Sequence, residues 1–254
     1  MRIVTHTCSN TEIVCALGRA DWLVGVDDHS DHPPEVVRHL SRIGPDLDVD
    51  IDRIRALKPD LVITSLTVPG HEHGLEKMRA AGLPLLVTQP HNLADVADDI
   101  VRIGKAIDAG SEAQRLASRF HETLERPRPA DSLLPVLVEW WPKPVIVPGR
   151  RSWVNEMLEL AGACNPWADE DAESLQISPE QARKAAPEII VMSWCGVDES
   201  KYRPHVVRRR EGWNAVPAVA GNRIHAVSEA WLGRPGPRLL EGIERLRALV
   251  TSYQ

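Results

Sequence analysis

The sequence has few cysteines and no long apolar run. The cysteines are widely separated and lack the paired spacing of a zinc site or a redox motif, so we expect free thiols at Cys8, Cys15, Cys164 and Cys195. No stretch approaches the roughly 20 apolar residues that a membrane-spanning helix requires. These two absences argue against a disulfide-stapled domain and against a chain that crosses a bilayer.

The chain also lacks a surplus of positive charge. Its formal net charge is −6, whereas binding to nucleic acid needs clustered cations that neutralise phosphates. We therefore expect no nucleic-acid partner. The run Arg208-Arg209-Arg210 is an exception to this acidic balance, and we interpret it as a solvated helix face.

Motifs of known catalytic sites are absent as well. We find no nucleophile elbow, no phosphate-binding glycine loop and no metalloprotease His-Glu pair, so the sequence does not predict an enzyme. Met1 and Arg2 lead directly into an apolar segment without a secretory signal in front. As written, the sequence predicts a cytoplasmic protein, and a periplasmic or cell-surface location would require a segment upstream.

Aromatic residues are scarce except for tryptophan, which occurs eight times against two tyrosines and one phenylalanine. Tryptophan offers a large flat apolar face and one N–H donor, so a surplus suits stacking against a flat ligand. We expect four of the eight to be core or lobe-surface residues, namely Trp22, Trp153, Trp167 and Trp213.

Short apolar segments alternate with helical ones, which predicts an α/β fold. Strands are expected at residues 2–4, 23–26, 61–64 and 85–87, and again at 136–139 and 189–192. Helices are expected between them, with Ser9 and Asn10 as candidates for the N-cap of a first helix over 11–17. Such alternation is typical of parallel sheets covered by helices.

Residues 92–125 differ from this pattern. Apolar side chains recur there at helical spacing over some 30 residues, with Gly104 and Gly110 as weak points. The pattern predicts one long helix, or a helix with a bend, that ends at the prolines within 126–129.

Two segments on either side of this helix share one plan. Residues 52–63 and 180–191 each contain a short helix that ends at a proline, then an acidic residue, then three aliphatic residues. We infer two similar halves separated by the long helix.

At this point the sequence resembles the helical-backbone metal-receptor family, the binding proteins of ABC importers for cobalamin, haem and iron-siderophores. The matching stretches span nearly the whole chain in the order of the family, and they are closest to the vitamin B12 branch. They are Ser9-Asn10-Thr11-Glu12-Ile13 with Ala16-Leu17-Gly18, Val24-Gly25-Val26, Ser30-Asp31-His32-Pro33-Pro34, Lys58-Pro59-Asp60-Leu61-Val62-Ile63, Ser178-Pro179-Glu180-Gln181, and Trp231 with Gly236-Pro237-Arg238.

The resemblance implies two α/β lobes at 1–91 and 129–254, joined by a backbone helix over 92–128, with the ligand in a cleft between the lobes. It also implies that Glu72 and Glu180 dock onto arginines of a membrane permease. As written, the sequence leads us to expect a departure from the family, namely no leader and no N-terminal hairpin before the first strand. It also carries His29 and His32 where aromatic residues are common.

A parallel sheet binds ligands at the carboxyl ends of its strands, so the loops that follow the strands are candidate binding segments. In the N-terminal half these loops supply the predicted ligand-binding residues Cys8, Ser9, His29, His32, Ser65 and Leu66. In the C-terminal half they supply Trp140, Trp141, Trp194, Trp231 and Arg234. The tryptophans would form an apolar wall, and Arg234 would pair with a carboxylate or phosphate.

Neutral imidazole is a good ligand for cobalt or iron, and a bound corrinoid has an axial position to fill. His29 or His32 is therefore a candidate metal ligand, and the alternative is that both are exposed to solvent or hydrogen-bond side groups of the ligand. His71 and His73 flank Glu72 with spacing that suits a surface metal ion, but no third ligand is apparent.

The sequence predicts a monomeric substrate-binding protein for cobalamin or a related corrinoid or metal chelate. It would serve an ABC importer and hold no intrinsic cofactor. Two alternatives stay open. One is a cytoplasmic corrinoid-processing or metal-chelate-processing enzyme, carrier or sensor, and the other is a binding protein for an iron-siderophore or haem.

Overall fold

The computed structural model describes residues 1–128 and 133–254. These residues form two compact units, unit 1 (Met1–Pro90 and Ala94–Glu122) and unit 2 (His91–Leu93 and Thr123–Gln254). Each unit contains a parallel sheet with helices, which confirms the predicted α/β class. The start of the predicted C-terminal lobe, 129–132, lies outside the described residues.

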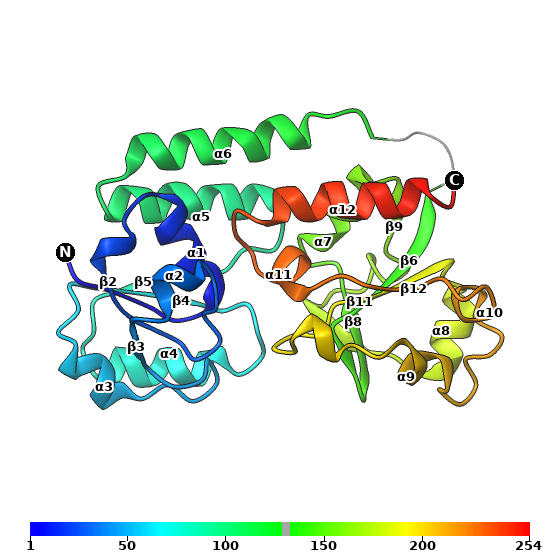
Figure 1. Ribbon diagram of the computed structural model, residues 1–254, viewed down its shortest axis with the longest axis horizontal. Coiled ribbons are helices and arrows are strands. Elements are labelled where there is room, and N and C mark those ends of the chain that lie inside the picture. Colours follow the sequence, from blue (N-terminus) through cyan, green and yellow to red (C-terminus); the bar gives the residue numbers. More distant parts are fainter. Residues whose placement is uncertain (129–132) are drawn as a thin grey trace. The chain divides into compact units, whose positions relative to one another are not determined.

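Within residues 1–128, the strands of unit 1 form one parallel sheet in the order β3-β2-β1-β4-β5 (Figure 1). Parallel strands are covered on both faces, so they need continuous aliphatic runs. Ile3, Val4, Val62 and Ile63 provide such runs and are fully buried. The strands are β1 (Ile3–Thr5), β2 (Leu23–Val26), β3 (Ser41–Arg42), β4 (Leu61–Ser65) and β5 (Leu85–Thr88).

Helices connect these strands. α3 illustrates their local signals, because the Asp50 side chain caps it by accepting a hydrogen bond from the Arg53 amide at 3.0 Å. The helical segments of unit 1 are α1 (Cys8–Ala16), the 3₁₀ turn η1 (Ala20–Trp22), α2 (Pro34–Val37), α3 (Ile51–Ala56), α4 (His71–Ala80), α5 (Leu93–Ala106) and α6 (Gly110–Leu124).

The first helix begins earlier than predicted. α1 starts at Cys8, and its N-cap is Thr7 with φ 89°, so Ser9 and Asn10 lie inside the helix and not at its cap. Both are buried, and the Asn10 amide donates to the His6 carbonyl at 3.0 Å. The polar run that looked like a capping signal therefore serves buried hydrogen bonds.

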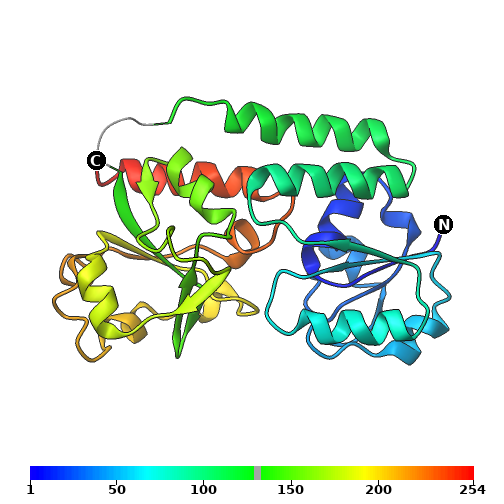
Figure 2. The same cartoon turned by 180° about the vertical axis from the view of Figure 1, so that it is seen from behind.

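The segment predicted as one long helix is divided into α5 and α6, which lie side by side (Figure 2). The helix stops where Asp108 adopts φ 50° and the Ala109 amide donates to the Gly104 carbonyl at 2.8 Å. A Cβ at Gly104 would meet the Cβ of Ala113 at 2.2 Å, so the missing side chain allows α5 and α6 to pack closely. One continuous helix over 92–125 is thus corrected to a helical pair.

Unit 2 contains a second parallel sheet in the order β12-β11-β6-β9. Its strands among the described residues are β6 (Leu134–Glu139), β9 (Ala163–Cys164), β11 (Ile189–Met192) and β12 (Ile224–Ala226). A separate antiparallel sheet, β10-β8-β7, consists of β7 (Trp141–Pro142), β8 (Val145–Pro148) and β10 (Ser174–Gln176). The sequence did not predict this antiparallel sheet.

The helices of unit 2 agree well with the sequence signals. Ser178 and Gln181 form a reciprocal capping box at the start of α8. The described helical segments are α7 (Val154–Leu160), α8 (Pro179–Ala185), the 3₁₀ turn η2 (Glu199–Lys201), α9 (Pro204–Arg208), α10 (Pro217–Ala220), α11 (Glu229–Leu232) and α12 (Leu239–Thr251).

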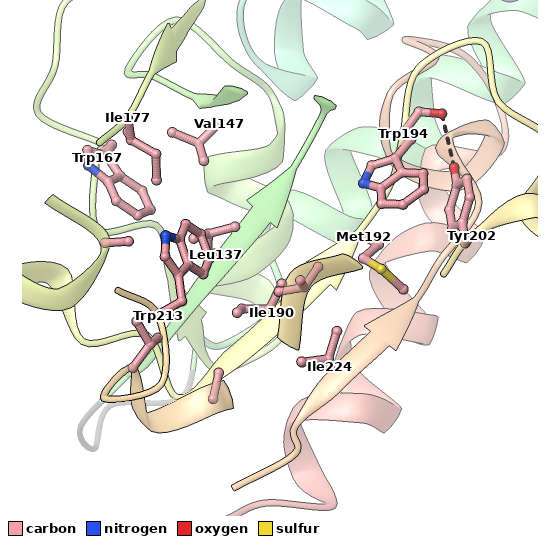
Figure 3. Packing of buried hydrophobic residues seen from close by; sticks show 14 residues of the cluster. Leu137, Val147, Trp167, Ile177, Ile190, Met192, Trp194, Tyr202, Trp213 and Ile224 are labelled. Carbon is pink, nitrogen blue, oxygen red and sulfur yellow. Dashed lines mark hydrogen bonds between the residues drawn. The ribbon is translucent and has the colours of Figure 1, made fainter. Parts of the chain in front are cut away.

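Tryptophans fill much of the core of unit 2. Trp167 and Trp213 pack with Leu137 and Ile190 of the parallel sheet (Figure 3). Trp153 is buried as well, and Trp22 is half-buried in unit 1. These four were expected to be core or lobe-surface residues, and the structure agrees: the three in unit 2 are buried and Trp22 is partly exposed. Within the described residues, no helix is both long and apolar enough to span a bilayer.

Candidate functional site

Polar side chains gather where the strands of unit 1 end. His6 follows β1, Asp27 follows β2, Ser65 ends β4 and Thr88 ends β5. These strands are parallel, so their carboxyl ends meet at one edge of the sheet. All four side chains are at least 97% buried. We call this group and its hydrogen-bond partners the strand-end network.

One half of the strand-end network joins hydroxyl groups. Ser65 shares hydrogen bonds with Thr88 at 2.7 Å and with Thr7 at 3.2 Å, and Asn10 donates to Ser65 at 3.0 Å. Thr7 also contacts the Ser9 hydroxyl at 3.1 Å. The structure therefore brings the predicted residues Ser9 and Ser65 together through Thr7. Both side chains are buried, and their hydroxyl groups form hydrogen bonds within the protein.

The other half is a histidine group around Asp46, in the loop before α3. His71 Nε2 lies 3.2 Å from Asp46 Oδ2, His29 Nε2 lies 3.6 Å from Oδ1, and His6 Nε2 lies 2.6 Å from the Asp46 carbonyl oxygen. The His6 and His71 rings meet edge to face at 5.2 Å between centroids. We call His6, His29, His71 and Asp46 the histidine cluster.

Electrostatics differ across the histidine cluster. Burial lowers the pKa of His6 to about 4, so His6 is neutral at pH 7. Burial alone would raise the pKa of Asp46, but the hydrogen bond from His71 and the neighbouring histidines lower it. Asp46 is thus a stable carboxylate. Burial raises the pKa of Asp27, against the hydrogen bonds that it accepts from Ser30 and the His29 amide.

His29 and His32 lie in the loop after β2. The His29 imidazole is 44% exposed, and Asp46 is its neighbour in the cluster. His32 is half-buried and precedes the cis peptide bond to Pro33. An exposed imidazole next to a carboxylate is well placed to coordinate a ligand metal, because a carboxylate partner strengthens the imidazole as a donor.

The remaining predicted residues of unit 1 flank the network. Cys8 begins α1 and is half-buried. Leu66 follows β4 and its amide donates to the Thr88 carbonyl at 2.9 Å. Within the described ranges, no three His, Cys, Asp or Glu side chains are grouped closely enough to hold a metal ion. That includes His71 and His73, because His71 is buried against Asp46 and His73 is exposed.

In unit 2, two of the predicted tryptophans adjoin the antiparallel sheet. Trp141 lies on β7, is 40% exposed and donates its indole N–H to the Lys143 carbonyl at 3.0 Å. Trp140 is half-buried between β6 and β7, and its backbone carbonyl accepts a hydrogen bond from the Cys195 amide. Trp141 in particular presents an open indole face.

Trp194 is more enclosed. It is 6% exposed and packs on Tyr202 (Figure 3). Its indole N–H donates to Glu139 Oε1 at 2.8 Å. Glu139 ends β6, is fully buried and forms a bidentate ion pair with Arg210. Trp194 therefore belongs to the hydrophobic core of unit 2, and little of its ring is open to a ligand.

Trp231 and Arg234 lie at α11. The guanidinium groups of Arg238 and Arg245 lie 5.1 and 4.2 Å from the Trp231 ring centroid. Arg234 is buried and pairs with Glu229 at 2.8 Å. Cations thus already adjoin the Trp231 ring, and the Arg234 fork is engaged with a carboxylate of its own unit.

Glu72 and Glu180 occupy equivalent local positions, because each is the second residue of its helix, α4 and α8 respectively. Both side chains are exposed. Hydrogen bonds from the backbone N–H groups of Glu72 and Gly70 lower the pKa of Glu72. An exposed carboxylate at a helix N-terminus is stabilised in its negatively charged form and can pair with a cation of a partner protein.

Sequence reasoning gave no role to His6, Asp46, Thr64 or Thr88. Thr64 Oγ1 lies 2.7 Å from His6 Nδ1, so it helps to fix the orientation of that ring. A hydroxyl residue at or next to the end of β1, β4 and β5 is the signal that could have pointed to them. Asp46 could not be placed, since it lies in the loop after β3, a strand of two residues that the sequence did not predict.

Comparisons with known proteins agree with this architecture. Residues 3–229 match a family model described as periplasmic binding protein. An uncharacterized ABC transporter substrate-binding lipoprotein of Bacillus subtilis is 30% identical over 96% of this chain and 78% of its own length. A vitamin B12-binding protein of Vibrio cholerae is 28% identical over 96% of this chain and 87% of its own length.

Two solved structures are similar throughout. The apo periplasmic heme-binding protein RhuT of Roseiflexus has a TM-score of 0.83 at 28% identity and covers 100% of this chain and 99% of its own. The periplasmic vitamin B12-binding protein BtuF of Vibrio cholerae has a TM-score of 0.80 at 27% identity, with 99% and 96% covered.

Proposed function

Because the chain belongs to the periplasmic binding protein family, we propose that it binds a corrinoid and delivers it to an ABC importer. Members of this family bind solutes for transport and are not enzymes, so a corrinoid-processing reaction is not part of the proposal. The observation that carries the ligand class is the end-to-end similarity to proteins named for vitamin B12 binding.

The chemistry of unit 1 supports a metal chelate as the ligand. The exposed His29 imidazole stands beside the Asp46 carboxylate, at the edge of the sheet where family ligands are expected. We propose that His29 fills an axial position of the bound metal and that His32 contacts ligand side groups. Cys8, Ser9, Ser65 and Leu66 would form the wall behind them.

In unit 2 we propose that the exposed rings contact the flat face of the ligand. Trp141 offers the most open ring, and Trp140 and Trp231 are half-buried. Trp194 would contribute only its edge. Arg234 would meet ligand carboxylates or phosphates only by sharing them with Glu229.

Haem is the second candidate, and the similarity to the Roseiflexus heme-binding protein favours it. Haem also presents an axial position to an imidazole. The two ligands differ in their spectra, so one experiment separates them.

The test is a visible-light titration of the purified protein with aquocobalamin, cyanocobalamin and haemin. Aquocobalamin carries an exchangeable axial water, so coordination by His29 should shift its spectrum, and His29→Ala should abolish that shift. Cyanocobalamin should bind with a smaller spectral change. His73→Ala, an exposed histidine on α4, is the matched control and should behave as wild type.

A response to haemin alone would replace the corrinoid by haem. No response to any of the three chelates would contradict the ligand class while leaving the family assignment in place. A corrinoid shift that persists in His29→Ala would remove the axial role of this residue.

We further propose that Glu72 and Glu180 dock onto the permease, which places the protein outside the cytoplasmic membrane like its periplasmic and lipoprotein relatives. Glu72→Gln combined with Glu180→Gln should reduce transport by the reconstituted permease without changing ligand affinity. Glu76→Gln, also exposed on α4, is the control. Equal transport by the double variant and the control would contradict the docking proposal.

A further inference from the structure

The arginine run at 208–210 does not form a uniformly solvated helix face. Arg208 is exposed, whereas the Arg210 side chain is only 9% exposed and pairs with the buried Glu139. Arg210 also lies over the Trp213 ring at 4.7 Å. Arg209 and Arg210, but not Arg208, line a cavity of unit 2. Arg208 and Arg209 are exposed as interpreted, although only Arg208 lies on a helix, and the interpretation is wrong for Arg210.

The cavity has a volume of about 710 Å³. It lies among the β7–β8 turn, the start of α8 and the segment that follows α9. Its apolar wall includes Pro142, Pro144, Val145 and Trp213. Volumes of roughly 300–1,000 Å³ with apolar walls and a few polar groups are typical of small-molecule sites. None of the residues proposed above to contact the corrinoid lines it.

The charged groups at this cavity favour an anion. Lys143 and Arg209 are exposed, and neither forms an ion pair with any residue that the structure describes. Glu211 is the acidic residue of the lining. Arg210 is neutralised by Glu139, so it adds no net charge to the lining. Lys143 and Arg209 then contribute two positive charges against the one negative charge of Glu211.

Arg210 adds an independent observation. Its Nε–H is buried and has no hydrogen-bond acceptor within the described part of the chain, although both Nη atoms bind Glu139. A buried donor without an acceptor costs about 1–3 kcal/mol. Arg210 is itself one of the residues that line the cavity, so this unmet donor belongs to a residue of the cavity wall.

We propose that this cavity is a second binding site, for a small organic anion whose carboxylate or phosphate group sits on an apolar or aromatic body. Lys143 and Arg209 pair with the anionic group, and the prolines and Val145 pack against the body. The limited excess of positive charge and the bounded volume favour a small molecule over an acidic protein segment or a nucleic acid.

The test is a titration of the isotope-labelled protein with phenyl phosphate, benzoate and inorganic phosphate, followed by NMR. Signals of residues that line the cavity should move with the two aryl anions. Lys143→Gln combined with Arg209→Gln should weaken this binding by about tenfold or more, since two charge-assisted contacts are lost. Both residues are exposed, so the variant should fold normally.

Arg208→Gln is the matched control, because Arg208 is the exposed neighbour that does not line the cavity, and it should bind as wild type. Equal weakening in Arg208→Gln and the double variant would indicate general charge attraction and overturn the site. Inorganic phosphate binding as tightly as phenyl phosphate would overturn the apolar component. An unmoved spectrum with both aryl anions would overturn the proposal outright.

Discussion

At the scale of single residues, buried polar groups are the least replaceable features of this protein. Glu139 is fully buried and accepts hydrogen bonds from Arg210 and Trp194. Such an ion pair contributes little net stability relative to apolar residues, but removal of one partner leaves the other charge buried and uncompensated. The two members should therefore respond very differently to single and paired replacement.

We predict that Arg210→Met lowers the free energy of unfolding by about 3–5 kcal/mol. Glu139→Leu combined with Arg210→Met should recover much of that loss, because no buried charge remains. Urea unfolding of the single and double variants measures the coupling between them. Additive losses would mean that the pair does not act as a unit.

His6 gives the protein a specific acid sensitivity. Its folded pKa is about 4, whereas the ordinary value is 6.5. The unfolded chain therefore binds the proton first, so stability falls as the pH drops from about 6.5 towards 4. From these two values, His6 should remove about 2 kcal/mol of stability between pH 7 and pH 5.

Comparison with His6→Gln isolates this contribution. Burial raises the pKa of Asp99 to about 6, and that carboxyl acts in the opposite direction as the pH falls. Asp99 is present in both the wild type and His6→Gln, so its effect cancels when the acid-induced stability losses of the two proteins are subtracted. Urea unfolding of both at pH 7 and pH 5 should show the larger acid loss in the wild type, and equal losses would exclude a buried neutral His6.

At the scale of elements, the two sequence segments that share one plan form the same helix–strand unit in the structure. The two matching segments become α3 with β4 and α8 with β11. In each, the residue before the proline has a positive φ, 47° at Lys58 and 44° at Ala186. β4 and β11 both pair in parallel with the first strand of their sheets, β1 and β6. Local signals of helix end, proline and aliphatic run therefore suffice to predict these units.

Other elements were beyond such signals. β7 ends at Pro142 and Pro144 directly precedes β8, and these prolines hide the alternation expected of an antiparallel pair. The division into α5 and α6 depends on close packing at Gly104, which periodicity does not show. Loops after β1, β2 and β4 were predicted as binding segments, but β3 was not predicted, so the loop after it that carries Asp46 was not expected at this edge of the sheet.

Gly104 provides a test at this scale. Gly104→Ala places a Cβ 2.2 Å from the Ala113 Cβ, so α5 and α6 must separate. We expect a loss of about 1–3 kcal/mol from overpacking, despite the better helix propensity of alanine. Gly110→Ala, which meets nothing within 4 Å, is the control. Thermal or urea unfolding should show a loss only in the first variant.

At the scale of the whole molecule, family membership fixes the class of activity, while we propose that a few side chains decide the ligand. Similar proteins named for heme and for vitamin B12 both align over nearly the whole chain. The fold is therefore compatible with both chelates. Exposed groups such as His29 and Trp141, and not the buried networks, should discriminate between them.

The number of ligands per chain can be determined from stability alone. If one corrinoid binds only the folded protein, the free energy of unfolding rises by RT ln(1 + [L]/Kd), or about 1.4 kcal/mol for each tenfold increase in free ligand above Kd. Urea unfolding at several aquocobalamin concentrations should give that slope. Two ligands bound per chain would double it to about 2.8 kcal/mol per tenfold increase, and a slope near zero would exclude binding to the native state. Lysozyme measured in parallel should show no slope, which controls for any effect of the corrinoid on urea denaturation itself.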